Sequence, residues 1–148
     1  MSDIGPPDDI AAIKALIARQ FHSLSWSNER PADWAGFARD FAAGAALYPA
    51  ARPVAPQSLD AFIARMKGLA AGVMQSFDET VLGVRVIAFG NVAVAAAAGE
   101  FVENGTTVTR NVEMMLLVKD AGAWSIVAQG WDRVTPERPL PPGLVGNG

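Results

Sequence analysis

The spacing of apolar residues changes from a helical to a strand period about halfway along the chain. Up to Val73, apolar side chains recur at every third or fourth position, as in helices with one buried face. From Phe77 onward the period is two, which is typical of β-strands. The pattern predicts an α+β fold, in which three N-terminal helices pack on a strongly curved antiparallel sheet.

The expected helices are separated by proline-containing segments. The first is predicted over residues 8–25, the second begins near Pro31, and the third follows Ser58, whose hydroxyl suits an N-cap. Between the second and third, Ala45–Tyr48 is expected to form one short strand. Apolar residues mark the buried faces: Ile10, Ile13, Ile17, Phe21 and Leu24 on the first helix, Trp34, Phe37 and Phe41 on the second, and Leu59, Phe62, Ile63, Met66, Leu69 and Val73 on the third.

Four long strands are predicted over residues 80–89, 92–101, 107–118 and 124–132, and two turns set their register. A two-residue type I′ turn at Asn104-Gly105 would pair Glu103 with Thr106 and set Ala96 opposite Glu113. A second turn at Ala121-Gly122 would set Gly130 opposite Glu113 from the other side.

This register predicts which side chains surround Glu113. Small residues, namely Ala96, Ala98, Ala128 and Gly130, would share its face and leave a hollow around one long polar side chain. Gln129 and Trp131 would lie on the other face. Both faces are largely apolar, and three helices can cover only one of them. We therefore expect a homodimer that forms through the sheet face.

Length and composition narrow the classes of function. A chain of 148 residues, 51% hydrophobic and 18% charged, suits one domain over residues 1–148. Its core is expected over about 8–136, followed by a flexible tail, residues 137–148, rich in proline and glycine. The net charge of −3, without a basic stripe, predicts no nucleic-acid partner.

The numbers of cysteine and histidine residues exclude several kinds of functional site. The chain has no cysteine and a single histidine, His22, which excludes disulfides, thiolate nucleophiles and metal sites that need two imidazoles. We expect no metal and no cofactor. No secretory signal or membrane-spanning apolar run is visible, so a cytoplasmic protein without a membrane partner is the expectation.

Glu113 is the strongest candidate for chemistry. A carboxyl group in an apolar hollow has a raised pKa, as a general acid or base near neutral pH requires. Asn111 and Gln20 are its expected partners; the alternatives are a structural ion pair with Arg85 or an exposed position at the rim. The expected ligand-binding residues are Gln20, Phe21, Tyr48, Phe62, Met66, Met115 and Asp132, although such apolar residues often belong simply to a core.

Three segments carry a resemblance to a known superfamily: Asp33-Trp34-Ala35-Gly36-Phe37, Phe89-Gly90-Asn91-Val92-Ala93 and Trp124-Ser125-Ile126. With the order of elements, they resemble the nuclear transport factor 2-like (NTF2-like) superfamily, in particular its SnoaL-like group of small bacterial proteins with a cystatin-like cone fold. The resemblance spans roughly Asp8 to Pro136. It implies a cone with an internal apolar pocket, and commonly a dimer.

The resemblance does not transfer a known reaction to this chain. Members of the superfamily include ketosteroid isomerase, polyketide cyclases, limonene epoxide hydrolase, scytalone dehydratase and non-catalytic domains. The tyrosine of the isomerase falls near Phe21, its general base near Tyr48 or Pro49, and its acidic hydrogen-bond donor near Met114, beside Glu113. A dehydratase mechanism that relies on histidines has only His22 available.

Three hypotheses follow. The first is a non-catalytic protein that binds a small apolar molecule. The second is a lyase, isomerase or hydrolase of a small hydrophobic substrate that uses Glu113 as general acid or base. The third is a structural oligomerisation domain, which predicts a filled cone without a cavity.

Overall fold

The computed structural model describes residues 2–145. Within them, the α+β class and the order of helices before the main sheet agree with the prediction. The elements are α1 (Pro7–Leu24), α2 (Trp34–Arg39), β1 (Phe41–Tyr48), β2 (Gln57–Ser58), α3 (Leu59–Ala71), β3 (Phe77–Phe89), β4 (Val92–Glu103), β5 (Thr107–Asp120), β6 (Ala123–Arg133) and a short 3₁₀ turn, η1 (Pro142–Leu144).

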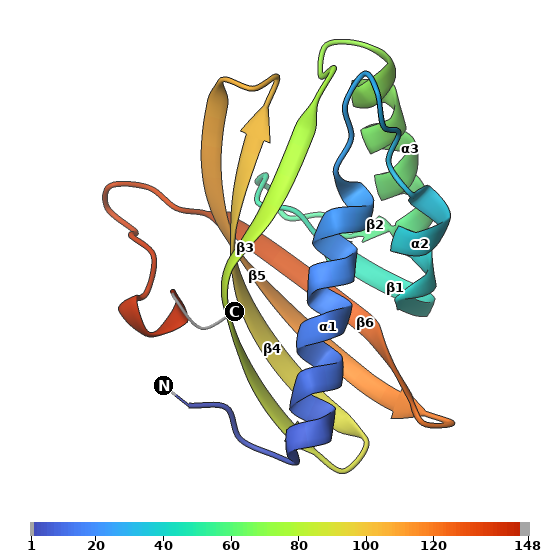
Figure 1. Ribbon diagram of the computed structural model, residues 1–148, viewed down its shortest axis with the longest axis vertical. Helices are drawn as coiled ribbons and strands as arrows, with labels where there is room; N and C mark the ends of the chain where they lie inside the picture. Colours follow the sequence, from blue (N-terminus) through green and yellow to red (C-terminus); the bar gives the residue numbers. More distant parts are fainter. Residues whose placement is uncertain (1, 146–148) are drawn as a thin grey trace.

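One six-stranded sheet runs in the order β2-β1-β6-β5-β4-β3. Its long strands are antiparallel, but β1 pairs with β6 in parallel, so the sheet is mixed rather than purely antiparallel as expected. Figure 1 shows the sheet curving behind α1, with α2 and α3 beside its β1 end. The helices therefore cover the concave face, and the core lies between them and the sheet.

Local signals in the sequence explain where the helices begin. Pro7 occupies the first turn of α1, and the Asp33 carboxylate accepts a hydrogen bond of 2.9 Å from the backbone N–H of Gly36 in α2. The predicted N-cap of α3 is confirmed, because the Ser58 hydroxyl accepts from the N–H of Ala61 at 3.1 Å. Phe41, expected on the second helix, instead begins β1, since α2 ends at Arg39.

The turn between β4 and β5 holds one residue more than expected. Asn104 and Gly105 both have positive φ, 51° and 71°, and the N–H of Thr106 donates to the carbonyl of Glu103 at 3.1 Å, as in the predicted turn. Glu103 nevertheless pairs with Thr107 in the ladder. The extra residue shifts the register by one, so Glu113 lies opposite Ala97 and not Ala96.

A bulge shifts the β5–β6 ladder in the same direction. The turn at Ala121-Gly122 closes as predicted, with Asp120 opposite Ala123. The register then changes between Leu116 and Leu117, which leaves Val127 of β6 unpaired and sets Glu113 opposite Trp131 instead of Gly130.

The predicted surroundings of Glu113 were therefore wrong, although its burial was not. Ala97, Gln129 and Trp131 share its concave face by strand alternation. The small residues expected around it, Ala96, Ala98, Ala128 and Gly130, belong to the opposite, convex face.

Part of the C-terminal segment packs onto the sheet. Leu144 of η1 is only 5% exposed, and its backbone lies so close to Gly83 of β3 that a side chain at Gly83 would collide with it. The expected flexible tail is thus anchored at Leu144, while its last three positions, 146–148, lie outside the described residues. No helix within residues 2–145 is long and apolar enough to cross a membrane.

Candidate functional site

A cavity of about 450 Å³ lies between the concave face of the sheet and the helices. Its walls come from α1, α2, α3 and all of the strands except β2. Slightly more than half of the lining residues are apolar or aromatic, including Leu24, Phe37, Phe62, Met66, Phe101 and Trp131. The polar side chains that matter for chemistry are Gln20, Glu79, Asn111, Glu113 and Gln129, and further polar residues of the lining are Arg65, Glu103, Thr109, Asp132, Arg133, Thr135 and Arg138.

Glu113 on β5 is held by a chain of side-chain amides. It is 7% exposed, and its Oε1 accepts a hydrogen bond of 2.7 Å from Nε2 of Gln129 on β6. The Oε1 of Gln129 in turn accepts one of 2.6 Å from Nε2 of Gln20 on α1. Gln20 was expected to contact Glu113 directly, but it acts through Gln129, a residue the predicted register put on the wrong face.

The environment of Glu113 suits proton transfer near neutral pH. Burial raises the pKa of the Glu113 carboxyl from 4.5 to about 7, because the charged form loses its hydration. Hydrogen bonds from Gln129 and Asn111 oppose that rise by stabilising the carboxylate. A group of this pKa can both accept and donate a proton at physiological pH.

Glu79 on β3 is, besides Glu113, a carboxyl of the cavity with a buried oxygen, and it was not among the predicted site residues. Its Oε2 is buried and has no hydrogen-bond partner among the described residues. Burial, followed by the negative charges of Glu113 and Asp78, raises the pKa of Glu79 well above its usual value. A signal was present in the sequence: Glu79 interrupts the inward-facing positions Phe77 and Val81 at a period of two.

The predicted site residues divide into two groups. Those that line the cavity are Gln20, Phe62, Met66, Asn111, Glu113 and Asp132. The other three lie elsewhere. Phe21 packs against Gly99, where any side chain would collide with its ring; Tyr48 is 42% exposed and borders hollows on the convex side; and Met115 is buried in the core.

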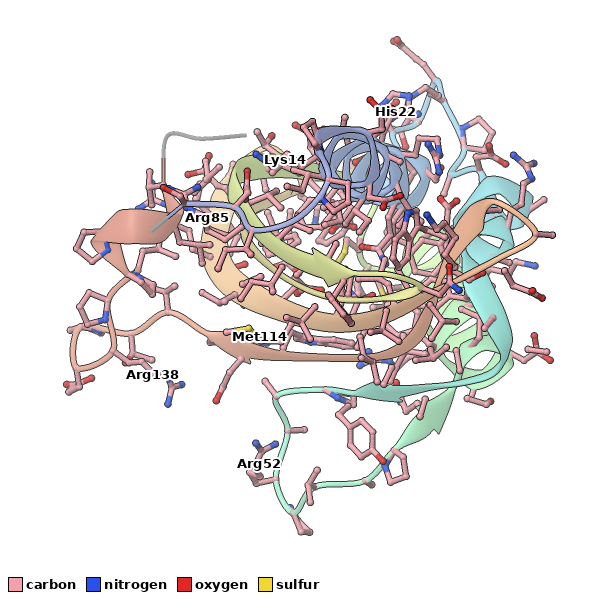
Figure 2. The ribbon with its side chains drawn as sticks, turned by 90° about the horizontal axis from the view of Figure 1, so that it is seen from below. Lys14, His22, Arg52, Arg85, Met114 and Arg138 are labelled. Atoms are coloured by element: carbon pink, nitrogen blue, oxygen red, sulfur yellow. The ribbon has the colours of Figure 1, made fainter. Side chains whose placement is uncertain are left out.

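The structure also locates Arg85, the alternative ion-pair partner of Glu113, and His22, the single histidine. Arg85 pairs with Ala96 in the β3–β4 ladder and so lies on the convex face, across the sheet from Glu113. Figure 2 shows His22 on the outer side of α1, pointing away from the sheet. Within residues 2–145, no cluster of histidine, aspartate or glutamate is suited to hold a metal ion.

Comparison with known proteins identifies the fold. A scan against protein-family models and a search of curated proteins found no match. Among solved structures, an NTF2-like protein of unknown function from Pseudomonas putida superposes with a TM-score of 0.70 at 14% identity, over 86% of this chain and 87% of the other. A cystatin-like fold protein from Nostoc punctiforme gives 0.69 at 16% identity, over 95% and 100%.

A third similar structure has an assigned activity. A Novosphingobium aromaticivorans protein, provisionally assigned as a scytalone dehydratase, has a TM-score of 0.70 at 13% identity, over 86% of this chain and 85% of that one. At such low identities these likenesses concern the fold alone. The chain has the NTF2-like, or cystatin-like, fold that its sequence resembles.

Proposed function

We propose that the protein binds a small, mostly apolar molecule in the cavity, with a polar group of that molecule beside Glu113. The observation that carries this proposal is a cavity of about 450 Å³ whose wall combines apolar and aromatic side chains with a buried carboxyl. Pockets for small molecules typically measure about 300–1,000 Å³ and combine apolar walls with a few placed polar groups. A cavity of this size also argues against a purely structural domain with a filled cone.

The amide chain supports a binding site that is formed before the ligand arrives. Gln20 and Gln129 fix the Glu113 carboxyl through hydrogen bonds of 2.6 and 2.7 Å, so little side-chain entropy remains to be lost on binding. Residues from α1, β5 and β6 meet in this network. A network that joins a helix to two strands holds its polar groups in a defined position against the cavity.

A second candidate function is acid–base catalysis by Glu113, as in a lyase, isomerase or hydrolase. The observation that favours it is the pKa of Glu113, which lies at about 7. The provisional dehydratase assignment of one similar structure is consistent with this class. A mechanism here would depend on a carboxyl group of the cavity, because the single histidine of the chain, His22, is exposed and outside the cavity lining.

A screen of small apolar molecules by thermal shift, followed by assays of any binder as a substrate, tests both candidates. Binding that survives in Glu113→Gln without turnover by the wild type supports a binding protein. Turnover by the wild type that is lost in Glu113→Gln supports the enzyme. Turnover that Glu113→Gln leaves intact would contradict the catalytic role.

We further infer that two copies associate through the convex face of the sheet. That face carries exposed apolar side chains from three neighbouring strands: Ile87 of β3, Val92 and Val94 of β4, and Met114 and Leu116 of β5. Met114 is 57% exposed, and Figure 2 shows it on the side of the sheet opposite α1. Burying a continuous apolar surface of this kind is the main driving force for association.

A further inference from the structure

Glu79 and Glu113 face the same cavity from two different strands. Glu79 pairs with Phe101 across β3 and β4, and Phe101 pairs with Thr109 across β4 and β5. Thr109 and Glu113 are four residues apart on β5, so both carboxyl groups project from the concave face. They are close enough for the charge of Glu113 to raise the pKa of Glu79.

Neither carboxyl has a positively charged partner among residues 2–145. The ion pairs of that region involve neither Glu79 nor Glu113. Glu79 has, in addition, the buried oxygen without a hydrogen-bond partner. Ionising both carboxyl groups costs free energy, because they share one cavity, are shielded from water and have no cation between them.

None of the charged side chains around the cavity forms an ion pair with Glu79 or Glu113. The other acidic residues are Asp78, which precedes Glu79 on β3, and Glu103 and Asp132, which line the cavity. The basic residues in the lining are Arg65 from α3, Arg133 from β6 and Arg138 from the C-terminal segment. Arg138 pairs with Asp132 at 3.2 Å, and the guanidinium of Arg65 lies over the Phe62 ring at 5.5 Å. Arg133 is exposed.

We propose that the ligand carries a protonated amine, and that its ammonium group binds between Glu79 and Glu113 while its apolar part fills the rest of the cavity. This inference rests on the proposed binding function and specifies the class of ligand. An ammonium group supplies the opposite charge and up to three N–H donors, enough for the unpartnered oxygen of Glu79 and for Glu113 together. A neutral group supplies no charge.

Aromatic rings beside the carboxyl pair suit the same ligand. Phe77 and Phe101 line the cavity next to Glu79, because Phe77 lies two residues before it on β3 and Phe101 lies opposite it on β4. Their rings stack with centroids 5.9 Å apart. The face of an aromatic ring attracts a cation, and carboxylates combined with aromatic rings are a usual way to bind amines.

Binding of an ammonium group is coupled to the release of protons. In the empty cavity near neutral pH, burial holds a share of the two carboxyl groups in the protonated form. A bound cation favours their ionised form, so the ligand displaces protons and its affinity rises with pH. A neutral ligand that accepted a hydrogen bond from a protonated carboxyl would show the opposite trend.

The test compares two probes of nearly the same shape, 2-(1-naphthyl)ethylamine and 2-(1-naphthyl)ethanol, by isothermal titration calorimetry at pH 6 and pH 8. We expect the amine to bind at least about ten-fold more tightly than the alcohol, a difference typical of one charge-assisted contact. We expect its affinity to rise from pH 6 to pH 8, and its binding enthalpy to depend on the buffer because protons are released.

Isosteric variants test whether the preference for the amine comes from Glu79 and Glu113. Glu79→Gln and Glu113→Gln should each reduce the preference for the amine, whereas Glu29→Gln, at an exposed position, should retain it. Circular dichroism confirms that each variant is folded. Equal affinity for both probes, or an affinity for the amine that falls with pH, would overturn the inference while leaving a small-molecule pocket. Binding of neither probe by the folded wild type would count against the proposed function itself.

Discussion

Gln129 donates a hydrogen bond of 2.7 Å to Glu113 across the β5–β6 ladder, and this contact exists only because β6 contains a bulge. Without the unpaired residue at Val127, Gln129 would face the convex side and Glu113 would lack its principal donor. The bulge at Val127 thus brings the Gln129 amide and the Glu113 carboxyl together in the cavity. The pKa of Glu113 should depend on this hydrogen bond.

Stability is expected to fall as the pH rises from about 4.5 to about 7. The pKa of Glu113 is about 7 in the folded protein against 4.5 when unperturbed, so the folded state holds this proton more strongly than the unfolded state does. The resulting stabilisation is complete below the lower value and is lost as the pH rises through the higher one. Glu79, whose pKa is also raised, acts in the same direction.

Urea denaturation across this pH range measures that dependence. In the wild type the free energy of unfolding should decrease by roughly 2–4 kcal/mol from Glu113 alone. Glu113→Gln should give a flatter profile, while the exposed Glu29→Gln should match the wild type. A Glu113→Gln profile as steep as that of the wild type would show that Glu113 does not titrate in this range.

Gln129→Leu should raise the pKa of Glu113 further and destabilise the protein. The substitution removes the donor that favours the carboxylate and leaves the Gln20 amide without its acceptor. Loss of a buried hydrogen-bond partner costs about 1–3 kcal/mol. A carbon NMR titration of the glutamate carboxyl groups gives the pKa, with Gln75→Leu at an exposed position as the control. An unchanged pKa would mean that the hydrogen bond does not form in solution.

Asn104→Ala should destabilise the turn that sets the β4–β5 register. The Asn104 Oδ1 accepts from the backbone N–H groups of Gln75 and Ser76, and its Nδ2 donates to the carbonyl of Val73. Asparagine also tolerates its positive φ of 51° better than alanine does. We expect a loss of about 1–3 kcal/mol in thermal or urea denaturation. Asn91→Ala, in the turn between β3 and β4, is the control, and its loss of unfolding free energy should be smaller than that of Asn104→Ala.

Met114→Lys and Leu116→Glu should each shift the protein from dimer to monomer. Both residues lie on the exposed apolar part of the convex face, where a buried charge without a partner would strongly oppose association. Sedimentation velocity gives the oligomeric state. Val73→Lys, at an exposed position after α3, should leave the dimer intact. A wild type that sediments as a monomer would remove the dimer from this account.

The sequence predicted the type and order of the main elements well, because amphipathic periodicity and caps such as Ser58 are local signals. The strand register was not predictable in the same way. The extra residue at Thr106 and the bulge at Val127 change which residues face inward, and both strands remain apolar in either register. For this reason Glu113 was recognised as buried, while its partner Gln129 was assigned to the wrong face.

Residues that meet only through tertiary structure were the harder part of the site. Glu79 reaches the cavity because β3 pairs with β4, and no short motif connects it to Glu113. Phe21 and Met115 have the size and polarity of lining residues, but they are used to fill the core. Apolar type and period alone do not distinguish a cavity wall from a packed interior.

The central claim is that the cavity binds a small, mostly apolar molecule. Native mass spectrometry of the purified protein tests it most directly, by comparing the wild type with Thr109→Trp. Thr109 lines the cavity from β5 and is only partly buried, so an indole there should fill the cavity without disturbing the core. Val108→Trp, at the exposed neighbouring position on the other face, is the control. We predict a reproducible added mass on the wild type and on Val108→Trp that Thr109→Trp lacks. The same mass on all three proteins, or none on the wild type even after incubation with small apolar molecules, would contradict a ligand site in this cavity.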